Sequence, residues 1–218
     1  MFMNALKVSC LAIVLWLASW TQATAALSLF DGHSFHGWNG DTNQTWRIRD
    51  GAIVGGSLTA QVPRNEFLCT DRRFTNFVLR LKFKLTGRSG FINAGVQVRS
   101  ERIANPPNEM TGYQADLGDP EWWGCLYDES RRNKVLAKSD MNQLRQRLKT
   151  NDWNAYEIRC EGRRIRLFVN GLQTVDYREP DPNIPQFGLI GLQIHGGAVA
   201  EVSYKDITLE ELPADLEP

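Results

Sequence analysis

Seven polar side chains in three separate segments stand at alternate positions and are of the types that hydrogen-bond a small polar ligand. They are Asn93, Gln97, Arg99, Gln114, Asp116, Gln193 and His195. Amides both donate and accept hydrogen bonds, and imidazole ordinarily titrates near neutral pH. Lysine and glutamate, the usual side chains of a solvated surface, are absent from the set. The pattern predicts a binding or catalytic cleft for a small molecule. The alternative is an ordinary solvated face of a sheet.

The elements that must position these side chains are strands. Residues 91–99, 113–117 and 190–195 alternate between apolar and polar types, and a period of two is typical of a half-buried strand. Residues 77–85 and 164–169 also alternate, but their polar positions are mostly lysine and arginine. Long cationic side chains suit a well-solvated outer surface. We therefore expect the two sets of strands to present different faces, and only one of them to carry a site.

The whole chain indicates an all-β fold, a two-sheet antiparallel sandwich. We expect strands near 45–49, 52–55, 67–70, 76–86, 91–100, 112–118, 122–127, 134–138, 153–161, 163–169, 172–178, 186–195 and 198–210. Asn170-Gly171 is the strongest hairpin signal, and a change of parity near Lys205-Asp206 predicts a β-bulge. Only 140–149 is predicted to be helical, with Asp140 as its N-cap.

The first 25 residues have the composition of a signal peptide. A weakly basic start precedes an apolar run too short to span a bilayer, and Ala23-Thr24-Ala25 matches a cleavage site. An uncleaved membrane anchor is the alternative. We expect residues 26–218 to form one exported domain, periplasmic or extracellular in a bacterium, with no membrane span after removal of the signal.

The charge and the cysteine content argue against several classes of protein. The chain has 25 basic and 25 acidic residues and a formal net charge of zero. Without a long run of either sign, it does not resemble a protein that binds nucleic acid or an anionic membrane. Cys69, Cys125 and Cys160 follow the predicted signal, and their wide spacing argues against a zinc site or a disulfide framework. We expect buried free thiols, with a single bridge left open.

A series of short motifs resembles one known family along most of the chain. In order they are LFDG (29–32), GW (37–38), W-x-I-x-DG (46–51), NAG…R (93–99), GYQ (112–114), GCLY (124–127), WN (153–154), NG (170–171), G-LQ-H (191–195) and KDI (205–207). Their order and spacing are similar to those of the secreted bacterial 3-keto-disaccharide hydrolase or 3-keto-glucoside lyase family. The resemblance covers roughly 27–212 and implies a concanavalin-like jelly roll with a small carbohydrate bound on its concave sheet.

The chain departs from the common family pattern at two places. Asn93-Ala94-Gly95 stands where many relatives have Asn-Ser-Gly. Gln114 and Asp116 stand where many have glutamate and then glutamine two residues later. The set of polar side chains therefore keeps one acid, but that acid stands one pleat repeat further along the strand. The reaction can be shared while the role of the acid or the substrate differs.

The reaction that the resemblance implies begins with a ketone at C3 of the sugar, which acidifies the proton on C2. A base removes that proton, the C1 substituent leaves by β-elimination, and water can add afterwards. We assign His195 as the base, with a structural histidine as the alternative. Arg99 is expected to stabilise the enolate or clamp hydroxyls, the alternative being an ion pair with Asp116. Asp116 is expected to act as base or acid, or to orient His195 or Arg99.

The remaining candidates are expected to bind the sugar. They are Asn93, Gln97, Gln114 and Gln193 as partners of hydroxyl groups, Tyr127 and Trp123 as stacking rings, and Glu129. Trp123 is chosen over Trp122 because, in a continuous strand, it shares a face with Cys125 and Tyr127.

No cofactor is assigned from the sequence, although a divalent metal is possible. His195 and Asp116, with Asp119 or Glu129, could hold a cation, but no H-x-H or H-E-x-x-H spacing supports this. Two other functions compete with the enzyme. A carbohydrate-binding module would show an exposed aromatic row with few titratable groups, and a structural envelope domain would show no clustered site.

Overall fold

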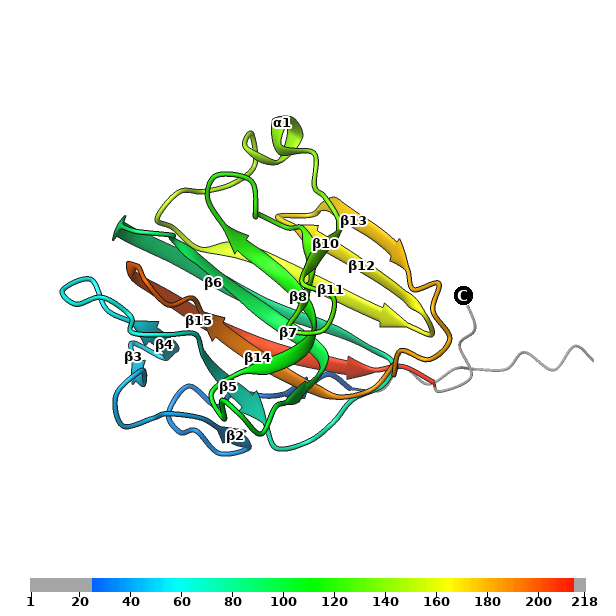
Figure 1. The fold of residues 1–218 in the computed structure, drawn as a ribbon, viewed down its shortest axis with the longest axis horizontal. Coiled ribbons are helices and arrows are strands. Elements are labelled where there is room, and N and C mark those ends of the chain that lie inside the picture. Colours follow the sequence, from blue (N-terminus) through cyan, green and yellow to red (C-terminus); the bar gives the residue numbers. More distant parts are fainter. Residues whose placement is uncertain (1–24, 214–218) are drawn as a thin grey trace, which may run out of the picture.

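The computed structural model describes residues 25–213, which form two antiparallel sheets that face each other across a common apolar core (Figure 1). The predicted all-β jelly-roll sandwich is therefore confirmed. The predicted signal peptide lies outside the described residues, apart from its last position, and its cleavage and the export of the protein stay predictions. Within the described residues, no helix is long and apolar enough to cross a membrane.

The sheet that carries the polar set is called the site sheet below. It has the order β10-β9-β8-β7-β14-β5-β2. Its strands are β2 (Trp38–Asn39), β5 (Glu66–Thr70), β7 (Asn93–Arg102), β8 (Met110–Gly118), β9 (Leu126–Glu129), β10 (Lys134–Ala137) and β14 (Leu189–Ile194). The three predicted polar segments thus form β8, β7 and β14, three neighbouring strands at its centre.

The second sheet, called the opposite sheet, has the order β13-β12-β11-β6-β15-β4-β3, with β1 paired to β15. Its strands are β1 (Leu27–Ser28), β3 (Trp46–Arg49), β4 (Ala52–Gly56), β6 (Phe77–Ser89), β11 (Asn154–Glu161), β12 (Arg164–Val169), β13 (Leu172–Arg178) and β15 (Val199–Glu211). The lysine- and arginine-rich strands β6 and β12 both lie here. Their cationic side chains form ion pairs such as Arg80 with Glu157, at 2.7 Å.

The alternation of the central strands decides which side chains enter the core. Ala94, Val96 and Val98 of β7 are fully buried between the sheets, and the polar residues of the same strand face the other way. Two tyrosines of the opposite sheet reach across the core to the backbone of the site strands. The Tyr204 hydroxyl lies 2.9 Å from the carbonyl oxygen of Gly95, and the Tyr156 hydroxyl lies 3.5 Å from that of Asp116.

Local signals in the sequence are met closely at the turns. Asn170 and Gly171 have φ values of 48° and 79°, as a tight hairpin of two left-handed residues requires. The register of β15 against β6 shifts between Lys205 and Thr208, and Asp206 has a φ of 53°, so the predicted bulge is confirmed. Cys69, Cys125 and Cys160 are all buried and free.

Two predicted elements are wrong in extent. The helix expected over 140–149 is only α1 (Met141–Leu144), capped by the Asp140 carboxylate, which accepts hydrogen bonds from two backbone N–H groups. Leu144 is its one buried residue, and so short an apolar face does not stabilise further turns. The strand expected over 122–127 begins only at Leu126, because residues 119–124 form turns, with Gly124 at a φ of 65°.

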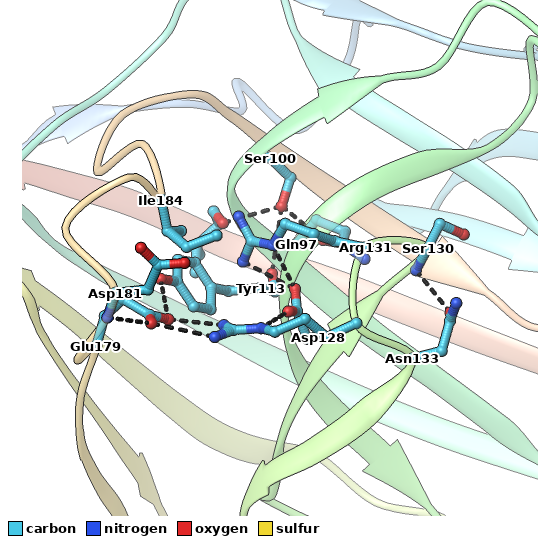
Figure 2. A network of polar contacts seen from close by, with 12 residues as sticks. Gln97, Ser100, Tyr113, Asp128, Ser130, Arg131, Asn133, Glu179, Asp181 and Ile184 are labelled. Atoms are coloured by element: carbon cyan, nitrogen blue, oxygen red, sulfur yellow. Dashed lines mark hydrogen bonds and ion pairs between the residues drawn. The ribbon is translucent and has the colours of Figure 1, made fainter.

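A buried ionic network fastens the outer strands of the site sheet (Figure 2). Asp128 of β9 and Glu179, just after β13, have fully buried side chains, and Arg132 forms ion pairs with both, its bond to Glu179 being 2.6 Å long. Tyr113 of β8 donates to Glu179 at 2.7 Å, and the Arg131 guanidinium lies 4.5 Å from the centre of the Tyr113 ring. The network therefore joins β8, the turn after β9 and the segment after β13.

We expect Arg132→Ala to lower the free energy of unfolding by about 3 kcal/mol at neutral pH, because it leaves two buried carboxylates without their shared cation. Burial opposes ionisation of Glu179, but hydrogen bonds from Arg132 and Tyr113 outweigh it and lower the pKa of Glu179 to about 2. This stabilisation is present above the unfolded value of 4.5 and is lost as pH falls towards 2. The difference in unfolding free energy between wild type and Arg132→Ala should therefore shrink at acidic pH.

Urea unfolding from neutral to acidic pH measures this effect. Arg164→Ala is the matched control, because Arg164 forms its ion pair with Asp176 on the surface and should contribute little. Equal losses in the two variants would contradict a special role for the buried network.

Candidate active site

A pocket opens on the polar side of the site sheet, at the ends of its central strands, with a volume of about 110 Å³. It is lined by Phe91, Asn93, Gln114, Asp116, Trp122, Tyr127, Glu129 and His195. These residues come from β7, β8, β9, the end of β14 and the connecting segments beside them. Polar groups converge on its floor and aromatic rings stand at its side, which is the composition expected of a small-molecule site.

A chain of hydrogen bonds runs along the polar side of the site sheet towards the pocket and ends on the Asp116 carboxyl. Ser100 donates to Gln97 Oε1 at 2.6 Å, Gln97 Nε2 donates to Gln114 Oε1 at 2.9 Å, and Gln114 Nε2 donates to Asp116 Oδ1 at 2.9 Å. Asn93 Nδ2 donates to the same oxygen at 3.3 Å. Because each amide oxygen accepts from the previous group, the chain fixes both glutamines with their N–H groups pointing towards Asp116.

Gly95 makes room for this chain. A Cβ atom at position 95 would lie 2.8 Å from Cγ and Cδ of Gln114, so any side chain there would displace the Gln114 amide. The Gly95 carbonyl oxygen is bonded to Tyr204 from the opposite sheet, which leaves the backbone little freedom to shift. The glycine is therefore required by close approach of a neighbouring side chain, not by a turn.

Asp116 is an acid held away from water. Its residue is 1% exposed, and burial raises the pKa of its carboxyl to about 8. The hydrogen bonds from Gln114 and Asn93 act in the other direction, and the charge of Glu129 adds to the rise. At neutral pH the carboxyl is therefore mostly protonated. Because Oδ1 accepts both amide bonds, the proton belongs on Oδ2, which lies 3.8 Å from the Cys125 Sγ, a weak donor and weak acceptor.

Glu129, the last residue of β9, is a second acid with a perturbed pKa in the same pocket. Burial is the main cause and the charge of Glu109 adds to it, so that the pKa of Glu129 rises to about 7. Unlike Asp116, it is only partly buried. Its carboxyl can therefore exchange protons with solvent or substrate at neutral pH. Two carboxyls of different burial, both shifted upward, are an arrangement typical of a catalytic site.

His195 follows β14 and is held by its own neighbours. Its backbone N–H donates to the Asn93 carbonyl at 3.1 Å, and its Nδ1 lies 2.6 Å from the Gly196 carbonyl oxygen. A carbonyl oxygen can only accept, so Nδ1 carries a hydrogen, and in the neutral ring the lone pair is on Nε2. The ring of Phe91 meets the imidazole edge to face at 4.8 Å and limits its rotation.

The side of the pocket is a series of aromatic rings. Phe91 meets Trp122 at a centroid distance of 5.9 Å, and Trp122 meets Tyr127 at 5.7 Å, both edge to face. Phe91 is 39% exposed, an unusual exposure for a phenylalanine. Apolar rings beside hydrogen-bonding groups match the two kinds of surface that a sugar ring presents.

The structure brings together six of the ten predicted site residues. They are Asn93, Gln114, Asp116, Tyr127, Glu129 and His195. Their shared position supports the sequence-based expectation of a site here, while the role of each residue stays a prediction. The other four, Arg99, Trp123, Gln97 and Gln193, do not line the pocket.

The structure corrects the expected position of Arg99, which lies outside the pocket. It has a φ of 50° at an irregularity of β7 between Val98 and Glu101, so the strand parity on which its assignment rested ends before it. Its guanidinium, buried at 2% exposure, donates to the Thr75 and Gly162 carbonyl oxygens and to the Asn76 and Gln186 side chains. It contacts neither the pocket nor Asp116, and it fastens separate loops together.

The choice between the two tryptophans is also corrected. Trp123 lies in the core, 8% exposed, stacked on Phe83 at 6.2 Å and donating from Nε1 to Asp119. Trp122 lines the pocket instead. The expected parity assumed a continuous strand, and the turns over 119–124 break it. Gly124 was the available signal, because a glycine beside a tryptophan pair indicates a turn. Phe91 has the same parity as Asn93 in the expected strand, and it was missed because only polar side chains were selected on that face.

Gln97 and Gln193 are fully buried on the polar side of the site sheet. Gln97 acts on the pocket only through Gln114. Gln193 of β14 pairs with Gly95 of β7 on one side and with Phe67 of β5 on the other. Within residues 25–213, its side-chain amide forms no hydrogen bond. The loop between β7 and β8 contacts the segment before β5, where Asn108 donates to the Asn65 carbonyl at 2.9 Å. Neither glutamine is therefore placed to bind the sugar directly.

Within the described residues, no group of three or more histidine, cysteine, aspartate or glutamate side chains is arranged to hold a metal ion. The possible divalent cation therefore stays a prediction from the sequence.

The fold and the pocket define a jelly-roll protein with a small acid- and imidazole-containing site on one sheet. The chain belongs to the family of the 3-keto-alpha-glucoside-1,2-lyase-like domain, whose model matches residues 25–210. The resemblance seen in the sequence motifs is thereby confirmed, and membership connects the protein with glycosides. No curated protein matches the sequence.

Solved structures of the same fold come from several proteins. A candidate glycosyl hydrolase from Parabacteroides distasonis has a TM-score of 0.62 at 18% identity, covering 85% of this chain and 93% of its own. The carbohydrate-binding module CBM66 from Bacillus subtilis has a TM-score of 0.62 at 16% identity, covering 80% and 96%. A Bacillus subtilis protein of unknown function with a galectin-like fold scores 0.64 at 11% identity, covering 87% and 97%. At these identities the likeness shows the fold alone.

The raised pKa of Asp116 predicts a cost to stability that Asp116→Asn removes. Between the unfolded value of 3.8 and about 8, the folded protein keeps a proton that the unfolded chain releases, so the stability of the wild type falls as pH rises through this range. Asparagine does not titrate and keeps an oxygen to accept the Gln114 and Asn93 bonds. We expect the variant to gain at least about 1 kcal/mol relative to wild type between pH 5 and pH 8.

Urea unfolding of both proteins at the two pH values measures this difference. A parallel pH dependence in wild type and variant would contradict a proton held on Asp116.

Proposed function

We propose that this pocket cleaves the glycosidic bond of 3-keto-glycosides or 3-keto-disaccharides by removing the C2 proton and eliminating the C1 substituent, with net hydrolysis when water adds. The observation that carries the proposal is the meeting, in one aromatic-walled pocket, of a histidine with a free Nε2 and two carboxyls with raised pKa values. Family membership supports the substrate class.

The steps need one base and two donors. The C3 ketone acidifies the C2 proton, which the base accepts as the enolate forms. The enolate then collapses to a C1–C2 double bond and the C1–oxygen bond breaks, while an acid protonates the leaving oxygen. Addition of water to C1 and return of a proton to C2 completes hydrolysis. Each proton transfer to a positioned group contributes about 10²- to 10⁴-fold.

His195 is the base in this proposal. Its Nδ1 is occupied by the Gly196 carbonyl, so Nε2 accepts the C2 proton and the resulting imidazolium remains hydrogen-bonded. The Phe91 ring and the hydrogen bond from the His195 backbone N–H to the Asn93 carbonyl hold the imidazole in place. This limits the reorganisation that proton transfer requires.

Asp116 takes the role that the sequence assigned to Arg99. As a buried neutral acid with two amides on Oδ1, it donates from Oδ2 to the ketone oxygen as negative charge develops there. Glu129 is partly exposed and has a pKa of about 7, which suits an acid that protonates the leaving oxygen and is then reloaded from water. Trp122 and Tyr127 supply the apolar face for the ring.

The proposal predicts that the purified protein converts a 3-keto-disaccharide but not its unoxidised parent, with products followed by NMR. His195→Ala should lower kcat by about 10²- to 10⁴-fold, whereas His36→Ala, at an exposed position, is the matched control and should not. Asp116→Asn keeps an N–H donor and should retain more activity than Asp116→Ala. The wild type should lose activity above about pH 7, as Glu129 and then Asp116 ionise, and Asp116→Asn should lose less than wild type above about pH 8.

The possible results separate the hypotheses. No turnover of the keto sugar would refute the enzymatic proposal. Equal losses in Asp116→Asn and Asp116→Ala would show that the carboxylate itself is needed and would assign Asp116 as a base. Turnover undiminished in His195→Ala would remove the histidine from the mechanism.

A carbohydrate-binding module is the second candidate function. The aromatic series of Phe91, Trp122 and Tyr127 favours it, and the fold is shared with a carbohydrate-binding module from Bacillus subtilis. The two titratable carboxyls favour catalysis, because binding alone does not require acids with raised pKa values. Saturable binding of sugars without any product would decide for the module.

A further inference from the structure

The carbonyl oxygen that orients the His195 imidazole belongs to a glycine, which by itself does not keep a fixed direction. Glycine has more backbone freedom than any other residue. Yet the Gly196 oxygen lies 2.6 Å from His195 Nδ1, so the peptide plane between Gly196 and Gly197 must face the imidazole. Contacts from outside the glycine pair are needed to fix that plane.

The segment just before β5 fixes the peptide planes on both sides of Gly196. The Gly197 N–H donates to the Val62 carbonyl oxygen at 2.7 Å, and the Gly196 N–H donates to Asn65 Oδ1 at 3.0 Å. In a trans peptide, the C=O and the N–H of one plane point in opposite directions. Because the Gly197 N–H points to Val62, the Gly196 carbonyl of the same plane points away from this segment and towards His195.

Gly196 also packs directly against the same segment. A Cβ atom at position 196 would lie 2.5 Å from Arg64 Cα and 2.9 Å from the Asn65 backbone nitrogen. This close approach brings the Gly196 N–H within reach of the Asn65 side chain. The glycine is therefore required by packing, and the hydrogen bonds to its neighbours supply the rigidity that its backbone lacks.

Asn65 is itself held by the loop between β7 and β8. Its Nδ2 donates to Glu109 Oε2 at 3.3 Å, and its backbone carbonyl oxygen accepts from Asn108 Nδ2 at 2.9 Å. A carboxylate accepts hydrogen bonds and does not donate them, so the Asn65 amide is fixed with Nδ2 towards Glu109 and Oδ1 towards Gly196. A continuous series of hydrogen bonds thus connects this loop with the imidazole.

We propose that Asn65 is a positioning residue for His195. By accepting from the Gly196 N–H, it keeps the glycine from turning, so that the Gly196 carbonyl holds the hydrogen on Nδ1 and leaves the lone pair on Nε2. Asn65 does not line the pocket and acts through Gly196. Its effect on catalysis rests on the proposed function, in which His195 is the base, whereas its effect on the imidazole does not depend on any substrate.

The tautomer of His195 tests the proposal without a substrate. In ¹⁵N-labelled protein with a neutral imidazole, the protonated and the unprotonated ring nitrogen differ in chemical shift, and comparison with His195→Ala identifies the signals. Wild type should show one tautomer, with the hydrogen on Nδ1. Asn65→Ala should show a mixture of both tautomers, and its Gly196 amide should exchange with solvent about tenfold faster. Because Asn65 is only partly buried, its truncation leaves the core intact.

Gln61→Ala is the matched control. The exposed Gln61 donates from Nε2 to the Gly197 carbonyl oxygen at 2.8 Å, which is a bond to the same glycine pair but to a peptide plane that does not face the imidazole. This variant should keep the wild-type tautomer and the wild-type kcat. The double variant Asn65→Asp with Glu109→Gln keeps an oxygen for the Gly196 N–H and reverses the direction of the second bond, so it should restore the single tautomer.

Kinetics separate positioning from binding. With a 3-keto-disaccharide, Asn65→Ala should lower kcat by about tenfold and change KM by less than about twofold, because the base is misoriented while the pocket lining is unchanged. If Asn65→Ala keeps the single tautomer, or if Gln61→Ala disturbs it equally, Asn65 does not position His195. If wild type converts no keto sugar, the proposed function is refuted, and the tautomer measurements still decide whether Asn65 orients the imidazole.

Discussion

The site depends on keeping one carboxyl group, that of Asp116, out of water. A buried carboxylate is costly, so the group retains its proton at a pH where it would otherwise be ionised. The surrounding amides do not neutralise it but decide which of its oxygens accepts and which carries the hydrogen. Much of the site sheet is arranged around this requirement, from the amide chain that begins at Ser100 to the absence of a side chain at Gly95.

The two sheets contribute to this arrangement in different ways. The site sheet supplies the side chains, and its alternation separates the apolar core from the polar floor. The opposite sheet supplies Tyr204 and Tyr156, which contact backbone carbonyl oxygens of the site strands. The ionic network around Glu179 connects β8, β9 and the segment after β13. The geometry of the pocket is therefore a property of the complete sandwich, not of the strands that line it.

Much of the fold follows from periodicity and turn chemistry. Alternation identified the central strands, the Asn170-Gly171 pair identified a hairpin, and the parity change near Asp206 identified a bulge, because each of these is decided by neighbouring residues. Arg99 and Trp123 were misplaced because the same reasoning considers only neighbouring residues and assumes a regular strand. Each lies beyond an irregularity, at a left-handed residue or a glycine turn, where counting by twos no longer tells which way a side chain points.

The environment of the acids was beyond sequence reasoning. Asp116 was recognised as an acid of the polar face, but its protonation follows from burial, which outweighs the hydrogen bonds from Gln114 and Asn93 that lower its pKa. Glu129 reaches the pocket because β9 pairs with β8, and Trp122 because the chain turns before β9. Such pairings join residues that are distant or irregularly spaced in the chain, and no local pattern encodes them.

The contact between His195 and Gly196 has a consequence for how this scaffold can diversify. The orientation of the imidazole is set by the carbonyl of the very next residue, whereas the acid opposite depends on a chain of side chains spread over two strands. Substitutions along the rim can therefore alter the groups that a ligand meets without disturbing the tautomer of the histidine. The contact that orients the imidazole lies within two adjacent residues, whereas the environment of Asp116 is distributed over two strands, so the pocket around the histidine can change while the histidine stays as it is.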